Sequence, residues 1–107
     1  MLKRENRLRG RKNLALMRKE GELFQNPLFG VVILEGKEEN RFGIVISKKI
    51  SKLAVERNKI RRRIYEAVAK ELKEMRKGIW VLFLVKREIM ERESEEIVRE
   101  VKKVLKR

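Results

Sequence analysis

The segment from about Val55 to Arg76 constrains the fold most, because its apolar residues recur at the spacing of a helix. On a helical wheel, one sector holds Ile60, Ile64, Ala67, Val68, Glu71, Leu72 and Met75, all apolar except Glu71. The opposite side holds Asn58, Lys59, Arg62 and Arg63, and Arg61 lies at the flank. The pattern predicts a long helix with one side buried in a core and a cationic side facing outward.

Apolar runs on both sides of this helix predict the strands of a sheet. Residues 28–34 (LFGVVIL) are apolar and β-branched, and residues 78–85 (GIWVLFLV) read as a strand buried on both faces. Residues 41–47 (RFGIVIS) alternate enough to pair with 28–34 as a hairpin across the polar turn 35–40. A short run at 22–24 (ELF) leaves open whether two or three strands precede the long helix.

Shorter helices are predicted near the two ends of the chain. Residues 11–20 form the first, with Leu14 and Met17 facing inward and Gly21 at its end. In the last helix Ser94 is the expected N-cap, followed by two glutamates in the first turn. The inner face of this last helix holds Ile97, Val98, Val101, Val104 and Leu105.

The order helix, two or three strands, helix, strand, helix predicts an α/β architecture in which helices cover a sheet. A length of 107 residues suits one compact domain, and no repeat or low-complexity linker divides it. The basic segment of about residues 1–10 reads as an N-terminal arm of that single domain.

The charge balance predicts an anionic partner. The chain has 30 Lys and Arg against 16 acidic residues, which gives a formal net charge of +14 and a pI near 10.6. Nucleic acid is the first candidate and an acidic membrane surface the second. Cysteine and histidine are absent, which excludes disulfides, zinc sites of the usual ligands, thiol nucleophiles and imidazole acid–base chemistry.

The cations concentrate between Ser47 and Arg63, where eight Lys or Arg accompany a single acid, Glu56. A solvated surface usually mixes charges of both signs, as the last helix does. Like charges one turn apart weaken a helix, and the phosphates of a nucleic acid would neutralise them and release counterions. Asn58 both donates and accepts hydrogen bonds, which suits a sugar, a base edge or a backbone cap.

The same residues also indicate whether the anionic partner is a membrane surface or DNA. A membrane surface would need the apolar side of the long helix, which the neighbouring strands and the last helix need for the core. The apolar run 79–85 is too short to span a bilayer. Helix-turn-helix, zinc-finger and basic-zipper patterns are missing, as is the aromatic-rich sheet signature of an RNA-recognition domain. The residues alone predict a basic α/β protein that binds nucleic acid, with RNA somewhat favoured over DNA.

Residues 47–66, SKKISKLAVERNKIRRRIYE, resemble a signature of the protein subunit of bacterial ribonuclease P, close to SKK…A…RN(R/K)IKR…RE. The matching positions are Ser47, Lys48, Lys49, Ala54, Arg57, Asn58, Ile60, Arg63 and Glu66. Residues 6–21, NRLRGRKNLALMRKEG, resemble the opening of the same family at Arg7, Leu8 and Gly21. The resemblance runs from residue 3 to about residue 85, and the closing helix fits in position.

The resemblance implies an α/β (α+β) two-layer sandwich with a four-stranded sheet, like the second domain of ribosomal protein S5. In that fold the strand–helix–strand crossover is left-handed, against the usual rule. It also implies a cytoplasmic protein component of ribonuclease P, whose RNA subunit, with bound Mg2+, cleaves the 5′ leader from precursor tRNA. The protein then needs no catalytic or metal-binding side chain. Its implied partners are ribonuclease P RNA and precursor tRNA, without a membrane or a small-molecule substrate.

The family's signature helix binds the RNA subunit, and a cleft between the sheet and the first helix holds the leader. By this resemblance, the residues that bind the RNA subunit are Lys48, Lys49, Lys52, Arg57, Asn58, Lys59, Arg61, Arg62 and Arg63. The residues that bind the leader are Arg11, Lys12, Leu14, Arg18, Phe29 and Val31.

Several family positions differ in this chain. Lys59 stands where the family usually has arginine, which keeps the charge but loses the planar fork. Leu14 replaces a phenylalanine, and Arg18 replaces a further aromatic residue. Stacking on aromatic rings contributes about 1–3 kcal/mol per base. Leader recognition here is therefore expected to rely on Phe29, Phe24 and the cations, although core packing is the simpler role for Phe24.

Two other functions stay open from the sequence. A structural RNA-binding protein, such as a ribosomal component, would use the same fold without taking part in processing. A protein-only nuclease would need clustered carboxylates to hold metal ions. Most acids of this chain lie on the last helix or beside lysines, at spacings typical of i,i+4 ion pairs.

Overall fold

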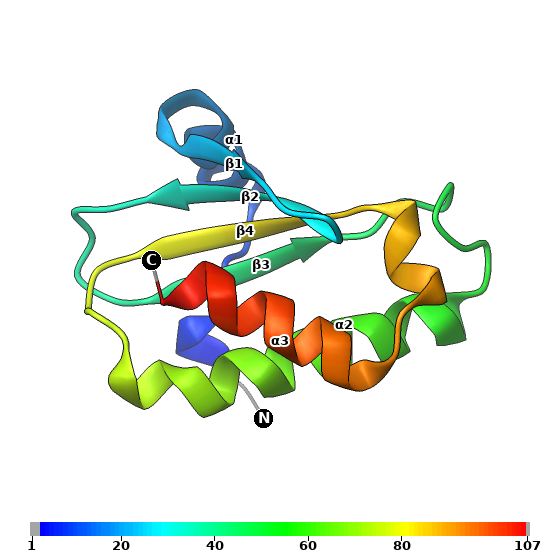
Figure 1. Cartoon of the computed structure of the whole chain (residues 1–107). Coiled ribbons are helices and arrows are strands. Elements are labelled where there is room, and N and C mark those ends of the chain that lie inside the picture. Colours follow the sequence, from blue (N-terminus) through cyan, green and yellow to red (C-terminus); the bar gives the residue numbers. More distant parts are fainter. Residues whose placement is uncertain (1–2, 107) are drawn as a thin grey trace.

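The computed structural model describes residues 3–106, which form a four-stranded mixed sheet with helices on both faces (Figure 1). In chain order the α-helices (α), 3-10 helices (η) and strands (β) are η1 (Arg4–Asn6), α1 (Arg11–Glu20), β1 (Glu22–Gln25), β2 (Phe29–Leu34), β3 (Arg41–Val45), α2 (Ala54–Glu71), η2 (Leu72–Glu74), β4 (Trp80–Val85), η3 (Arg87–Glu91) and α3 (Ser94–Leu105). All the predicted helices are present, and three strands precede α2.

The strand order β1-β2-β4-β3 corrects the predicted pairing of residues 28–34 with 41–47. β2 pairs antiparallel with β1 and β4, and among the described strands β3 pairs with β4 alone, in parallel. The hairpin is wrong because β4 lies between its two predicted strands. Residues 80–83 of β4 are buried, so the strand gains most from a central place in the sheet, where both faces are covered.

The parallel pair β3 and β4 is joined by α2 in a left-handed crossover. Figure 1 shows both strands running in the same direction, with α2 and α3 together in front of the sheet. With the helices toward the viewer, the path from β3 through α2 to β4 has the uncommon hand. This confirms the left-handed crossover that the resemblance implies, in a sandwich of the sheet against α2 and α3, with α1 on the opposite face.

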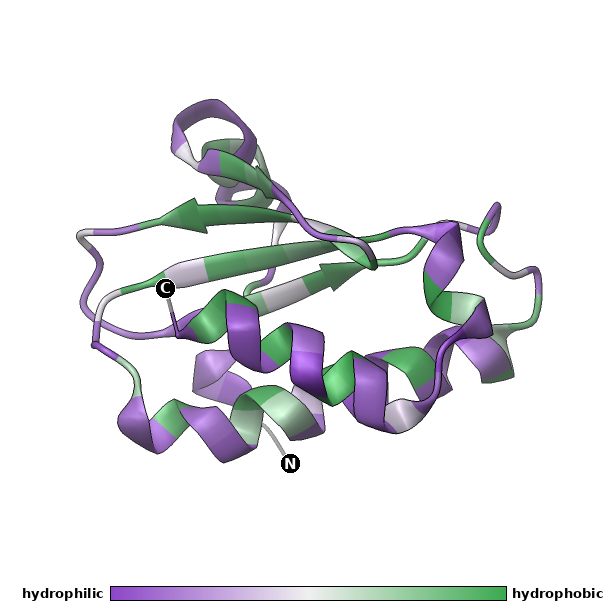
Figure 2. Ribbon diagram, in the orientation of Figure 1, coloured by the Kyte–Doolittle hydropathy of each residue, from purple (hydrophilic) through white to green (hydrophobic). Residues whose placement is uncertain are grey.

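The front face of the sheet, covered by α2 and α3, holds the larger core. The predicted stripe of α2 is confirmed, because Ile60, Ile64, Ala67 and Val68 are buried against the sheet and α3. Figure 2 shows the strands coloured as hydrophobic and the helices as mixed. The one charged member of the stripe, Glu71, is also buried, and its carboxylate lies 3.7 Å from the Lys102 ammonium of α3.

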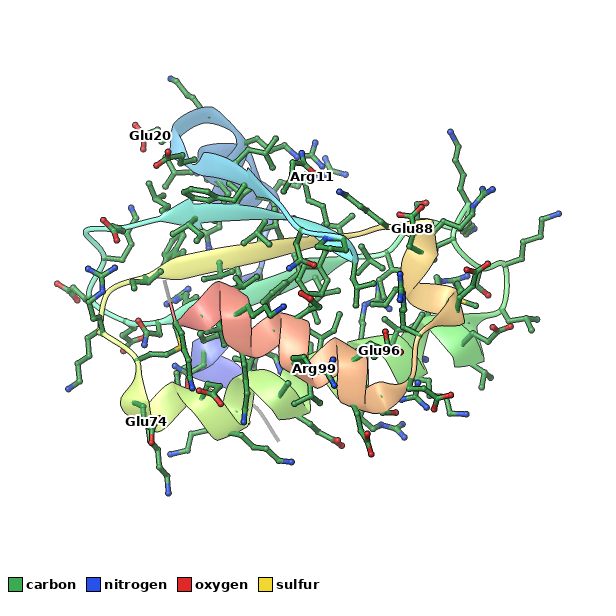
Figure 3. All side chains as sticks on the ribbon, viewed as in Figure 1. Arg11, Glu20, Glu74, Glu88, Glu96 and Arg99 are labelled. Atoms are coloured by element: carbon green, nitrogen blue, oxygen red, sulfur yellow. The ribbon has the colours of Figure 1, made fainter. Side chains whose placement is uncertain are left out.

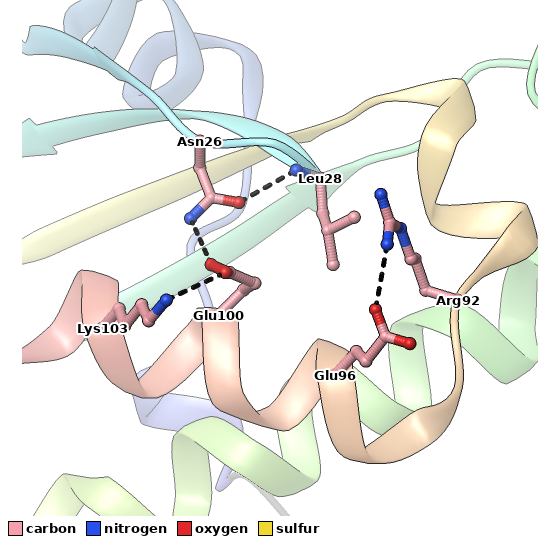
Figure 4. Close-up of polar contacts among 6 residues, drawn as sticks. All are labelled: Asn26, Leu28, Arg92, Glu96, Glu100 and Lys103. Atoms are coloured by element: carbon pink, nitrogen blue, oxygen red, sulfur yellow. Dashed lines mark hydrogen bonds and ion pairs between the residues drawn. The ribbon is translucent and has the colours of Figure 1, made fainter.

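Helix α3 is tied to its surroundings by carboxylates (Figure 4). Glu100 accepts from the Asn26 amide at 3.3 Å and pairs with Lys103 at 3.4 Å, which joins α3 to the turn between β1 and β2. The predicted cap at Ser94 is wrong: Glu93 holds the extended N-cap position, and no side-chain hydrogen bond caps the helix. An ion pair of 3.1 Å between Arg92 and Glu96 spans the first turn instead.

The rear face of the sheet is covered by α1 and by the segment before it. Met17 of α1 and Leu8 are buried there with Val32, Trp80 and Leu82. The basic arm lies along β3, where the Leu8 amide donates to the Phe42 carbonyl at 2.8 Å. Residues 1 and 2 of that arm lie outside the described residues. Among the described residues, no helix has both the length and the apolar composition that crossing a membrane requires.

We expect Gly78→Ala to destabilise the protein strongly. Gly78 has φ of 86°, and a Cβ there would overlap the Lys37 carbonyl in the loop that precedes β3. Gly36→Ala is the matched control, because Gly36 has φ of 83° but no atom within 4 Å of the added carbon. Chemical denaturation should show a loss of about 1 kcal/mol for Gly36→Ala and about 3 kcal/mol or more for Gly78→Ala. Equal losses would show that the contact with Lys37 has no part in stability.

Candidate nucleic-acid interface

The outward side of α2 and the loop before it form a surface of unpaired cations, here called the cationic ridge. Its members are the predicted residues Lys48, Lys49, Lys52, Arg57, Lys59, Arg61, Arg62 and Arg63. Within residues 3–106, none of these eight forms an ion pair with a carboxylate, whereas cations elsewhere pair with Glu35, Glu39, Glu71, Glu96 and Glu100. The structure therefore brings the predicted cations together and leaves their charge uncompensated.

Hydrogen bonds orient two arginines of the ridge without neutralising them. The Arg57 guanidinium donates to the Ser51 carbonyl at 2.8 Å, which fixes it against the loop. The Arg61 guanidinium donates to the Asn58 side-chain oxygen at 3.3 Å. Asn58 thus uses its oxygen on a ridge arginine, and its amide group stays free of partners among the described residues. A guanidinium held in this way is preorganised for phosphate oxygens.

The loop of residues 46–53 continues the ridge at the end of the sheet. Lys48, Lys49 and Lys52 are exposed on it. The Ser47 hydroxyl accepts from the Lys49 amide at 3.2 Å, and the Arg87 guanidinium donates to the Lys49 carbonyl at 3.2 Å. Arg87 is a cation that sequence reasoning missed. Its position two residues after β4 was the available signal, because β4 and the parallel β3 end at the same edge.

The N-terminal arm adds Arg7 and Arg9 beside α2, and both were missed as candidate site residues. The Arg7 guanidinium lies over the ring of Tyr65, 5.4 Å from its centroid. Arg7, Arg9 and Arg61 all act electrostatically on the Tyr65 hydroxyl. Tyr65 follows Arg61 by one helical turn, and Arg7 matches the family opening, so both signals were in the sequence.

Burial and charge compete at Tyr65. Burial raises the pKa of its hydroxyl because the phenolate loses hydration, while the charges of Arg7, Arg61 and Arg9 lower the pKa. Burial is the larger effect, so the pKa stays above its ordinary value. The hydroxyl beside the three arginines is therefore a protonated hydrogen-bond donor at neutral pH.

The predicted leader residues divide between the two faces of the sheet. Arg11, Lys12 and Arg18 are exposed on α1, and Leu14 is half-buried beneath it. Figure 3 shows Arg11 at the start of α1. Phe29 and Val31 are corrections: both are fully buried in the front core, under α2 and α3, so they are not available to a ligand. The ring of Phe29 packs edge-on against Phe83 at 5.1 Å.

The strand residues that alternate with Phe29 and Val31 face the rear of the sheet, and one partly exposed row of them is here called the rear strip. It crosses all four strands in register through Gln25, Gly30, Leu84 and Val45. The neighbouring row, which runs through Val32 and Leu82, is covered by Leu8 and Met17.

Partly exposed apolar side chains make the rear strip suitable for a bound chain. Gly30 itself is buried, with Leu84 and Leu23 at 3.6 and 3.7 Å from the position of an added Cβ, so the leucines and not the glycine form the surface. Leu23, beside the strip on β1, is 56% exposed. Val45 directly precedes the loop of residues 46–53, and the strip therefore opens toward the cationic ridge.

The pattern of residues that defines the Ribonuclease P family matches residues 2–107. The ribonuclease P protein component of Pseudanabaena sp. is 33% identical over 87 residues, covering 79% of this chain and 75% of its own. That of Picosynechococcus sp. is 30% identical over 105 residues, covering 97% and 90%. The chain belongs to the ribonuclease P protein family. Its role is that of a ribonuclease P protein component, which works in tRNA processing with an RNA subunit.

The three-dimensional comparison agrees with this assignment. The structure of the ribonuclease P protein from Thermotoga maritima superposes with a TM-score of 0.82 at 30% identity. The superposition covers 94% of each chain. The cationic ridge lies on the segment that carries the resemblance to the family signature, so ribonuclease P RNA is the partner of this chain.

Tyr65 is the only tyrosine of the chain, so its ionisation can be followed by ultraviolet absorbance. We expect the folded protein to titrate above the denatured protein, because burial outweighs the arginine charges. A folded pKa above the unfolded value means that this group's stabilisation is intact below about pH 10 and is lost as the pH rises through the folded pKa. Folded and denatured protein should be titrated side by side. A midpoint at or below that of the denatured chain would show that the arginines dominate.

Proposed function

We propose that the cationic ridge binds the phosphate backbone of ribonuclease P RNA and that the arm cations Arg7 and Arg9 extend this contact. The observation that carries the proposal is the set of eight ridge cations without a carboxylate partner in residues 3–106. The protein holds these like charges side by side, and a polyanion removes the repulsion while its counterions are released.

We also propose that the rear strip and α1 hold the single-stranded 5′ leader of precursor tRNA. The strip and the neighbouring Leu23 offer apolar contact from Leu23, Leu84 and Val45, and α1 supplies Arg11 and Arg18. Apolar side chains suit base faces and cations suit phosphates, as in other single-strand sites. Because the strip opens toward the ridge, one RNA surface can continue into the other without crossing the helices of the front face.

The cleavage step is proposed to belong to the RNA subunit, with Mg2+ bound by that RNA. Support comes from the donor set: in the described part of the chain, no three His, Cys, Asp or Glu side chains gather closely enough to hold a metal ion. Metal-assisted phosphodiester cleavage needs such a set when a protein supplies the metal. The protein's share is then to hold RNA and leader in place, in the cytoplasm where tRNA is processed.

A reconstitution experiment tests the assignment as a whole. Ribonuclease P RNA and precursor tRNAs with short and longer leaders are mixed at low Mg2+, with and without the protein. We expect the protein to speed or tighten processing, with a gain that grows with leader length. RNA binding without any gain would favour a structural RNA-binding protein, and cutting by the protein alone would show a protein-only nuclease.

Removing two ridge arginines should flatten the salt dependence of binding to ribonuclease P RNA. For Arg57→Ala with Arg61→Ala we expect a slope of log K against log salt that is smaller by about two units, roughly one for each lost phosphate contact. Arg99→Ala with Lys106→Ala is the matched control, because it removes an exposed cation of α3, labelled in Figure 3, and the exposed cation at the C-cap of that helix. A slope that changes equally in both variants, or in neither, would refute the role of the ridge.

A charge on the rear face should weaken leader binding alone. Leu23→Glu places a carboxylate beside the strip, where it repels the leader backbone. We expect the leader-dependent gain in processing to fall roughly fivefold, equivalent to about 1 kcal/mol, with unchanged affinity for the RNA subunit. Ser94→Glu adds the same charge at the exposed start of α3 and should leave the gain intact. If Leu23→Glu keeps the full gain, the leader does not use this face.

A further inference from the structure

Two exposed apolar side chains interrupt the cationic ridge at the start of α2. Val55 is 78% exposed and Leu53 is 60% exposed, the highest values among the large hydrophobic residues that the structure describes. Both lie between the cations Lys52 and Arg57, within the segment that forms the cationic ridge. Neither belongs to the core on either face of the sheet. These side chains are therefore available at the surface where the RNA subunit is proposed to lie.

The stability of the free protein does not account for them. Leu53 is the N-cap residue of α2, a position where Ser, Thr, Asp or Asn would accept a hydrogen bond from the backbone. No side-chain hydrogen bond caps this helix. Val55 is β-branched and lowers helix propensity slightly. Departures from local preference that bring the fold no gain are most often found at functional sites.

The surroundings of the two side chains indicate what they meet. Lys52, Arg57 and Lys59 are without carboxylate partners in the described residues, so a polyanion is the ligand of this surface. The side chains of leucine and valine cannot donate hydrogen bonds to phosphate oxygens. The apolar parts of RNA are the faces of its bases, which are accessible only where a nucleotide is unpaired or ends a stack.

We propose that Leu53 and Val55 pack against the face of an unpaired base in ribonuclease P RNA. This inference rests on the proposed function of the ridge. It adds a contact that depends on whether the RNA has an unpaired base at this place. The cations supply an attraction that any polyanion would feel and that salt weakens. The apolar pair supplies a part of the affinity that is independent of salt and is present only where the RNA exposes a base at this place.

The test is the double variant Leu53→Ser with Val55→Thr. Serine is a favoured N-cap residue and threonine keeps the β-branched shape, so α2 should form as well as in the natural chain. Thermal unfolding checks this directly. We expect affinity for ribonuclease P RNA to fall about tenfold at every salt concentration, the effect of one lost base contact. The slope of log K against log salt should not change.

Two single variants serve as controls. Lys52→Ser removes a neighbouring charge, and it should lower both the affinity and the slope, by roughly one unit. Leu23→Ser removes a similarly exposed leucine from β1, and it should leave affinity for the RNA subunit unchanged. Chemical probing of the RNA adds a direct readout. Unpaired bases that the natural protein shields should regain reactivity with the double variant and stay shielded with Leu23→Ser.

The outcomes separate this inference from the function on which it rests. Unchanged affinity of the double variant would overturn the inference alone, provided that the natural protein binds the RNA with the expected salt dependence. A loss of affinity with a shallower slope would also overturn it, because the pair would then act by placing cations. A natural protein that does not bind ribonuclease P RNA would overturn the proposed function and this inference together.

Discussion

The burial of one side of α2 is the constraint on which the rest of the structure depends. Ile60, Ile64 and Val68 are almost fully removed from solvent, and each contributes about 1.5–3 kcal/mol when buried. Each like-charged pair one turn apart on the other side costs only about 0.2–0.5 kcal/mol. The apolar side therefore outweighs the repulsion by a wide margin. The cationic ridge exists because the core holds the helix that carries it.

The same helix shows what could be predicted from sequence. When apolar and cationic residues each recur with the helical period, the sequence predicts both the buried and the exposed side of the helix. This works because the direction of each side chain follows from its position along the helix. The six predicted RNA-subunit residues of α2 therefore lie outside its buried stripe, whereas the three lysines lie on the preceding loop, where the helical period does not apply. On a strand, alternation tells only that Phe29 and Val31 share a face. The alternation does not predict which face of the sheet α1 covers. In the structure α1 covers the rear face, and Phe29 and Val31 lie on the other face, in the front core.

Strand order depends on contacts between distant segments, which periodicity does not contain. Residues 28–34 and 41–47 are joined by a short polar turn, so local reasoning makes them a hairpin. In the structure β4 enters between them, because a strand that is apolar on both faces is best buried in the centre. The left-handed crossover is equally invisible locally, and only the family resemblance implied it. The arm residues Arg7 and Arg9 were missed for the same reason, since their place beside Tyr65 depends on pairing with β3.

Helices α2 and α3 differ in how well their terminal residues match the preferences for capping and for the helix dipole. The difference distinguishes residues that serve folding from residues that are proposed to serve binding. Helix α3 has Glu95 and Glu96 in its first turn and lysines in its last, as the helix dipole favours. Helix α2 begins without a side-chain cap and carries Arg57 and Lys59 near its positive end. In the free protein, the N-terminal end of α2 is thus less stable than a capped end without cations would be. Under the proposed function, bound RNA removes the repulsion there, and the residues that lower the stability of α2 are the ones expected to raise affinity for its partner.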